Sequence, residues 1–225
     1  MNKRRSLNLL SLIANLSVVY FTAWSVIYNF RSDVYRPDRL TVGWGSLRYF
    51  TVLSNVFAAI ACAITFYFNV KNILRDEYKF PLWSVKLKYT ATVSVTVTFL
   101  TVVFFLAPYS AILGSGYFTL FRYNNFYLHF LSPVLVILSF ILSERAGELK
   151  FPLSFLGLAP TAIYSVLYTT MVLIGEERGG WPDFYGFTFG GDMIAAALSL
   201  IMMYIASFLI AIAVWIIRKK VCERE

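Results

Sequence analysis

One histidine and one threonine are the residues of this chain best suited to nucleophilic chemistry. His129 is the only histidine, and it lies three or four residues into an apolar segment long enough to cross a membrane. An ionisable residue in such a segment is costly to bury and is therefore a candidate for function. Thr51 lies three residues into another such segment. A threonine hydroxyl needs an adjacent base, and imidazole, with a pKa of about 6.5, is the usual one.

Three further residues favour a polar site at this depth. Ser54 and Asn55 follow Thr51 at the third and fourth positions, so all three share one helical face. Pro133 follows His129 by four residues and cannot donate to its carbonyl, so we expect a bend that opens room around the imidazole. Two simpler interpretations stay open: a backbone-bonded helix threonine, and a histidine that bonds to a neighbouring helix.

Two short stretches around these residues resemble a known family. Gly45-Ser-Leu-Arg48-Tyr-Phe-Thr51 is similar to the nucleophile segment of the androgen-induced membrane protein family, whose members are multi-pass threonine hydrolases. Asn124-Asn125-Phe-Tyr-Leu-His129-Phe-Leu-Ser-Pro133 resembles the segment that carries the family's essential histidine. The loop with Trp181, Pro182 and Tyr185 is similar to an aromatic loop before the family's last helix. Asn55 beside Ser54 resembles a variant found in bacterial relatives, so the chain is expected to be a distant bacterial relative of this family.

This resemblance implies an intramembrane ester hydrolase whose substrates are fatty acid esters of hydroxy fatty acids or similar lipid esters. Thr51 would attack the ester carbonyl, and His129 would take the hydroxyl proton and return it to the leaving alcohol. Neither a metal nor another cofactor is expected. The expected substrate-binding residues are Arg48, Ser54, Asn55, Asn125, Trp181 and Tyr185.

Three kinds of group could complete the site. Candidate donors to an oxyanion are the N–H groups of Asn55, Asn125 and Trp181. Candidate ligands for a lipid carboxylate are the guanidinium groups of Arg31, Arg48 and Arg122, unless each reaches to lipid headgroups instead. Candidates for orienting the imidazole are Asp183 and Asp192, unless both remain in water.

The composition indicates that membrane helices must position these residues. Of the 225 residues, 59% are hydrophobic and 14% charged, whereas soluble domains are about 45–50% apolar and about 25% charged. An aromatic share of 18% excludes a disordered chain. Two cysteines and one histidine exclude a disulfide scaffold and a zinc cluster. We therefore expect an integral membrane protein with one domain over residues 1–225.

Six stretches have the length of about 20 apolar residues that a spanning helix needs. They cover residues 7–30, 49–70, 89–113, 126–143, 153–174 and 193–217. Threonines alternate with apolar residues from Thr90 to Thr98, a pattern that strands of membrane barrels also use. The other stretches are too long for barrel strands, so we expect an all-α bundle in which these threonines bond to the backbone or face neighbouring helices.

The distribution of charge predicts the orientation. Of the 20 Lys and Arg residues, 14 lie on the side that carries both termini, which is therefore expected to be cytoplasmic. The basic N-terminus precedes an apolar run too long for a signal peptide, so the first segment should remain as an anchor. Anionic headgroups of membrane lipids are a sufficient partner for the net charge of +8, and nucleic acid is not expected. In a prokaryote the protein would lie in the cell membrane.

Two alternatives to an enzyme stay open. One is a transporter or lipid-binding protein in which His129 is a polar site within the membrane, and the other is a scaffold that only assembles partners. The sequence shows no paired acidic residue within the predicted spans, which counts against a transporter. The charged stretches Lys71–Lys88 and Glu144–Lys150 are expected to be solvated. The glycine-punctuated loop 179–192 could fold over the outer mouth of the bundle as a lid.

Overall fold

The computed structural model describes residues 3–31, 43–144 and 149–223, and within these ranges every regular element is helical. Six helical segments are long and apolar enough to cross a membrane. They are Arg5–Asn29, Phe50–Arg75, Leu82–Ile112, Asn124–Ser143, Phe151–Ile174 and Met193–Glu223. The all-helical class expected from the sequence is confirmed, and the six apolar helices are compatible with the expected multi-pass membrane protein.

Three of these segments are built from more than one kind of helix. The continuous helices are α1 (Lys3–Asn29), α2 (Phe50–Arg75) and α8 (Met193–Glu223). The third segment joins α3 (Leu82–Thr101) to α4 (Ala107–Ile112) through a π-helix at Val102–Leu106. The fourth joins α5 (Asn124–Phe126), a π-helix at Tyr127–Leu131, α6 (Ser132–Leu138) and a second π-helix at Ser139–Ser143. In the fifth, a 3-10 helix at Phe151–Leu158 leads into α7 (Ala159–Ile174).

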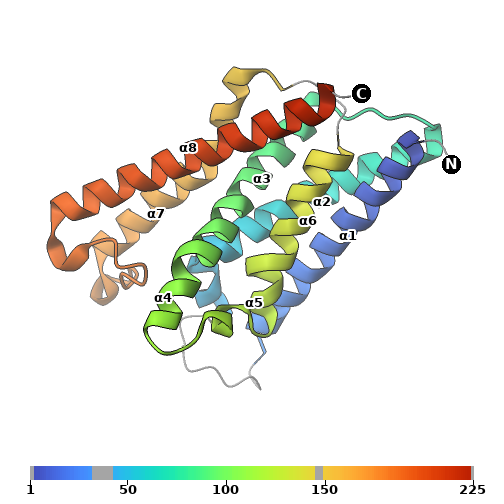
Figure 1. Ribbon diagram of the computed structural model, residues 1–225. Coiled ribbons are helices and arrows are strands. Elements are labelled where there is room, and N and C mark those ends of the chain that lie inside the picture. Colours follow the sequence, from blue (N-terminus) through green and yellow to red (C-terminus); the bar gives the residue numbers. More distant parts are fainter. Residues whose placement is uncertain (1–2, 32–42, 145–148, 224–225) are drawn as a thin grey trace.

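The helix α3 lies at the centre of the arrangement. It passes between the group formed by α1, α2 and α6 and the hairpin formed by α7 and α8, which diverges from that group at one end (Figure 1). In the most apolar window of the third segment 56% of the residues are buried, against 17% for α8. We conclude that α3 has little contact with lipid, whereas α8 offers most of its surface to the bilayer.

Three threonines of α3 bond to the backbone of their own helix and Thr98 bonds to Ser54 of α2, which are the two arrangements that the sequence predicted. Thr90 donates to the carbonyl of Lys86 at 3.0 Å, and Thr92 and Thr96 donate to the carbonyls four residues earlier at 2.7 Å. Such bonds hide the hydroxyl groups, so a threonine-rich helix can lie inside a membrane bundle.

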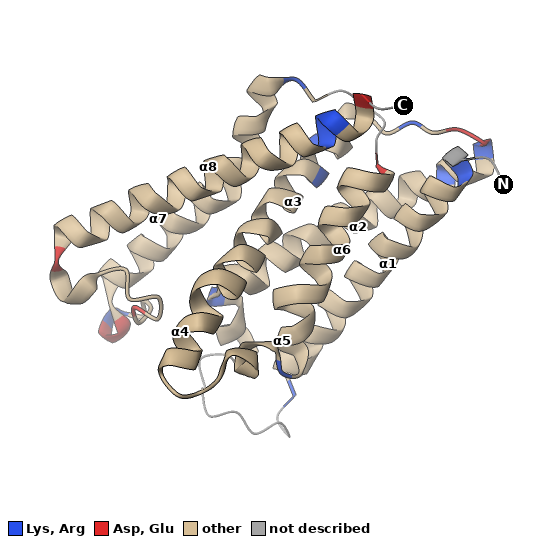
Figure 2. Ribbon diagram, viewed as in Figure 1, with Lys and Arg blue, Asp and Glu red and all other residues tan. Residues whose placement is uncertain are grey.

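Several helices extend beyond the predicted limits on the side of the termini. The third begins at Leu82, directly after Pro81, rather than at residue 89, and the last continues to Glu223 rather than residue 217. Lys and Arg residues gather toward the end of the molecule where both termini lie (Figure 2). Which side of the membrane this end faces stays a prediction.

Candidate functional site

Thr51 lies in the first turn of α2, where helix N–H groups lack partners within the helix. A 3-10 helix at Gly43–Arg48 leads into this turn, and no side chain caps the helix at Tyr49. The N–H of Phe50 instead donates to the hydroxyl oxygen of Tyr185 at 3.1 Å. The aromatic loop after α7 therefore contacts the chain one residue away from Thr51.

Asn55 connects the turn that carries Thr51 to the segment that carries His129. Its side-chain nitrogen donates to the carbonyl of Thr51 at 2.8 Å and to the carbonyl of Leu128 at 2.9 Å. The two carbonyl oxygens can therefore lie no further apart than about 5.7 Å, the two distances taken together. Asn55 is fully buried. Within the described ranges, however, no hydrogen bond joins the side chains of Thr51 and His129.

His129 lies in the π-helix at Tyr127–Leu131. This π-helix ends two residues before Pro133, the proline that was predicted to disturb the helix. The N–H of Ser132 donates to the carbonyl of Tyr127, five residues earlier, and Pro133 has no N–H to offer to the carbonyl of His129. Imidazole Nδ1 lies 2.6 Å from the carbonyl oxygen of Leu120. Because a carbonyl can only accept, Nδ1 carries the proton, and Nε2 of the neutral ring has a free lone pair.

The two aspartates considered for orienting the imidazole have other partners. Asp183 accepts hydrogen bonds from the Tyr168 hydroxyl at 2.6 Å and from the Thr188 N–H and hydroxyl at 2.7 and 2.6 Å. Burial alone would raise the pKa of Asp183, but these bonds outweigh it and hold that pKa below its ordinary value. Asp192 accepts from two N–H groups at the start of α8. The carbonyl of Leu120 holds the imidazole in their place.

The predicted substrate-binding residues of this region have two different surroundings. Asn55 is buried between two backbone carbonyls, whereas Arg48, Tyr185 and Trp181 lie near the start of α2 and in the loop that contacts it. Both N–H bonds of the Asn55 amide are used on carbonyls, so Asn55 is a positioning residue and cannot donate to an oxyanion. Near the start of α2, the Tyr164 hydroxyl donates to the carbonyl of Arg48 at 2.6 Å. Tyr185 is the residue whose hydroxyl accepts from Phe50, and burial raises the pKa of this hydroxyl to about 12. Trp181 lies in the same loop, and its ring centre is 6.1 Å from that of Phe184.

The remaining predicted residues lie at the edges of this region. Ser54 is buried, and its hydroxyl bonds to the Thr51 carbonyl at 3.1 Å and to the Thr98 hydroxyl at 2.9 Å. Asn125 is half-buried at the start of the fourth segment. Arg48 is half-buried, whereas Arg31 and Arg122 are exposed, as expected of side chains that reach to headgroups.

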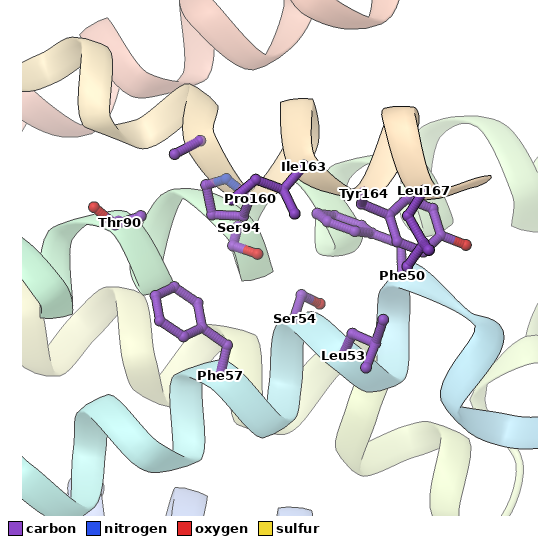
Figure 3. A pocket seen from close by; sticks show the side chains of 11 residues that line it. Phe50, Leu53, Ser54, Phe57, Thr90, Ser94, Pro160, Ile163, Tyr164 and Leu167 are labelled. Atoms are coloured by element: carbon purple, nitrogen blue, oxygen red, sulfur yellow. The ribbon is translucent and has the colours of Figure 1, made fainter. Parts of the chain in front are cut away.

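An apolar cavity of about 270 Å³ lies on another side of α2. Side chains of Leu53, Ser54 and Phe57 from α2 face Pro160 and Ile163 from α7 across it (Figure 3). Thr51 does not line the cavity, whereas Phe50 before it and Ser54 after it do. The region around Thr51 therefore has a polar side toward His129 and an apolar side toward α7.

A second polar centre, which the sequence interpretation missed, lies nearer the termini. The ammonium group of Lys88, 1% exposed, is 3.6 Å from a carboxylate oxygen of Glu144, whose side chain is 5% exposed. The ammonium also donates to the side-chain oxygen of Asn15 and to the sulfur of Cys62, the latter at 2.9 Å. The same carboxylate oxygen accepts from Ser11 at 3.0 Å and from Asn15 at 2.8 Å.

Two expectations are corrected by this buried ion pair. Lys88 and Glu144 are not solvated, because α3 begins early enough to carry Lys88 into the bundle; residues 145–148 of the predicted turn lie outside the described ranges. The absence of a paired acid, which counted against a transporter, also needs correction, because Lys88 of the third span is paired with Glu144, the residue that directly follows the fourth span. A signal existed in Ser11, Asn15 and Asn69, polar residues inside apolar helices that are all buried.

Across the described residues, no group of three or more His, Cys, Asp or Glu side chains is placed to hold a metal ion. Comparison with known proteins assigns no family: no protein-family model, curated protein or solved structure matches the chain. The resemblance to the androgen-induced membrane proteins therefore rests on the short motifs around Thr51 and His129.

Proposed function

We propose that the protein is an intramembrane lipid ester hydrolase in which Thr51 is the nucleophile and His129 the general base. The observation that carries the proposal is the double hydrogen bond of Asn55, which holds the carbonyl of Thr51 and the carbonyl next to His129 on one nitrogen. This contact joins the helical turn that carries Thr51 to the turn that carries His129, although the two residues are 78 positions apart in the chain.

The tautomer of His129 suits the role of a base. With Nδ1–H donating to Leu120, Nε2 can accept the proton of the Thr51 hydroxyl as the oxygen attacks an ester carbonyl. The imidazolium then returns that proton to the leaving alcohol. In the second half, His129 takes a proton from water as the water oxygen attacks the acyl-threonine, and the imidazolium returns this proton to the Thr51 oxygen as the acid leaves. Donors to the oxyanion would be Asn125 or Trp181, since the Asn55 amide is used elsewhere.

The surroundings of Thr51 suit a lipid substrate. The hydroxyl lies in the first turn of a membrane-spanning helix, so an ester can reach it from the adjacent leaflet. The loop of Trp181 and Tyr185 contacts the start of this helix and would limit the access of water to Thr51 from the end of the bundle at which α2 begins. Arg48 could hold a lipid carboxylate, as in the fatty acid esters of hydroxy fatty acids that the family resemblance suggests.

The proposal is tested by labelling purified protein with a fluorophosphonate probe and by measuring turnover of lipid esters. We expect Thr51→Ala to abolish both signals and His129→Ala to lower turnover by about 10²–10⁴-fold. Thr65→Ala is the matched control, because Thr65 lies on the same helix and bonds only to its own backbone. The assignment is wrong if both site variants fold and keep full activity.

A transporter or lipid-binding protein is the second candidate, and the buried pair of Lys88 and Glu144 favours it. In that case the ion pair, rather than Thr51, would carry the function. Uptake of lipid or small solutes into vesicles, measured per folded molecule, separates the two: Lys88→Met would abolish uptake, while Thr51→Ala would leave it unchanged.

A further inference from the structure

The cavity beside α2 forms a groove within the membrane-spanning part of the molecule. Its walls come from three different spans, α2, α3 and α7, and side chains of α7 face those of α2 across open space (Figure 3). Ile163, on the α7 wall, is 70% exposed, so this wall also borders the lipid. A molecule in the bilayer can therefore reach the groove sideways, between α2 and α7.

The lining of the groove is apolar apart from a few hydroxyl groups. Thr90 and Ser54 use their hydroxyls on protein partners. Ser94 lies on the floor, is fully buried, and has no hydrogen-bond partner for its hydroxyl among the described residues. Unpaired buried hydroxyls are unusual in a packed core. Because this hydroxyl is covered by its neighbours, the surface that an occupant of the groove meets is apolar.

The size of the groove limits what can occupy it. A volume of about 270 Å³ holds about nine groups of roughly 30 Å³, the volume of a water molecule and close to that of a methylene. The α2 wall from Phe50 to Phe57 has eight residues, so its two ends are separated by seven helical rises or roughly 10 Å, which matches about eight carbons of an extended chain. A protein helix, about 10–12 Å wide, does not fit.

We propose that this groove binds one acyl chain of a membrane lipid ester, with the ester at the Phe50 end and the chain running toward the middle of the membrane. Phe50 lines this end of the groove and directly precedes Thr51, so the end of the groove lies one residue from the nucleophile along α2. The inference deepens the proposed hydrolase and rests on it for the position of the ester. Longer chains leave the groove between α2 and α7 after about eight carbons.

Photo-crosslinking in lipid nanodiscs tests the groove without any turnover, using the Thr51→Ala protein. The probes are a methyl ester of a 16-carbon fatty acid with a diazirine at carbon 6, and the same ester with the diazirine at carbon 16. We expect the first probe to label peptides of α2 and α7 that line the groove. The second should label lipid-facing surface. Equal labelling of the groove by both probes would overturn the proposed chain path.

Two variants fill the groove, and one serves as a matched control. Ala159→Phe places a ring in the groove, whereas Ala197→Phe makes the same change on the exposed side of α8. We expect groove labelling to fall by about tenfold, equivalent to 1.4 kcal/mol, in the first and to stay unchanged in the second. Ile163→Trp is a second filling variant at a tolerant, exposed position. Unchanged labelling in both filling variants would refute the groove.

Failure of the groove and failure of the hydrolase give different results. If wild-type protein cleaves lipid esters but the groove is not labelled, the acyl chain binds elsewhere and only this inference falls. If the groove is labelled but Thr51→Ala has the turnover of the wild type, the site binds lipid and the threonine mechanism falls.

Discussion

Removal of either member of the buried pair of Lys88 and Glu144 should destabilise the protein strongly. In Lys88→Met, the carboxylate loses its ammonium partner while it remains buried; it keeps the neutral donors Ser11 and Asn15, and the guanidinium of Arg218, which bonds to the backbone carbonyl of Glu144, is the cation left beside it. In Glu144→Gln, the ammonium keeps only neutral partners, among them Cys62. Breaking a buried ion pair at one side costs about 3–5 kcal/mol, whereas replacing both charges costs much less. We therefore expect a coupling energy of about 3 kcal/mol in a double-mutant cycle.

The cycle is measured as the free energy of reversible unfolding in mixed micelles with increasing SDS. Lys219 and Glu223 provide a control pair at the same separation of 3.6 Å, with side chains 55% and 60% exposed. Their cycle should show no measurable coupling, since exposed pairs contribute little. Additive effects at Lys88 and Glu144, or a Lys88→Met protein as stable as the wild type, would refute the reasoning.

Three further predictions concern the loop between α7 and α8. Hydrogen bonds lower the pKa of Asp183 below 3.8 in the folded protein, so the stabilisation that this carboxylate gives the loop is complete above that pH and is lost as the pH falls through the lower native pKa. Tryptophan fluorescence should change in that acidic range, and Asp183→Asn should remove the change. Gly180→Ala would place a Cβ 2.2 Å from the carbonyl oxygen of Met171, so the thermal midpoint should fall. Tyr185→Phe removes the partner of the Phe50 N–H and should cost about 1 kcal/mol in unfolding free energy with the fold retained.

The helices could be predicted from the sequence because lipid imposes a strict condition on the backbone. Every N–H and C=O in hydrocarbon must be paired within a helix or closed barrel, so an apolar run of sufficient length indicates its own structure. The ends were less predictable. Lys86 and Lys88 gave the start of α3 the composition of a loop, although the helix begins at Leu82 after Pro81.

Polar residues within the apolar helices indicated a buried polar centre, but the ion pair itself could not be predicted, because its two members lie in distant parts of the chain. Burial of Lys88 depends on Asn15 and Cys62 of two other helices and on Glu144, which follows the end of the fourth segment. Only the packing of these helices shows that the charges meet. A count of charges along the chain placed both residues in water for that reason.

The candidate site was partly predictable. Helix direction and depth gave Thr51 and His129 the same level, and the bond from Asn55 to Leu128 shows that their turns are neighbours. The partner of the imidazole was not predictable, since any residue can supply a carbonyl, and the sequence does not show that Leu120 does so. The turnover expected of the pair stays a prediction.

The position of Lys88 on the central helix bears on the order in which the chain is assembled. As α3 enters the bilayer during synthesis, the partners already present are Asn15 and Cys62 on the two preceding helices, while Glu144 has not yet been made. A lone lysine disfavours insertion by about 2.5–3.5 kcal/mol at a helix centre. We therefore expect α3 to insert as a unit with α1 and α2. A chain truncated before the fourth segment should be retained by the insertion machinery or degraded.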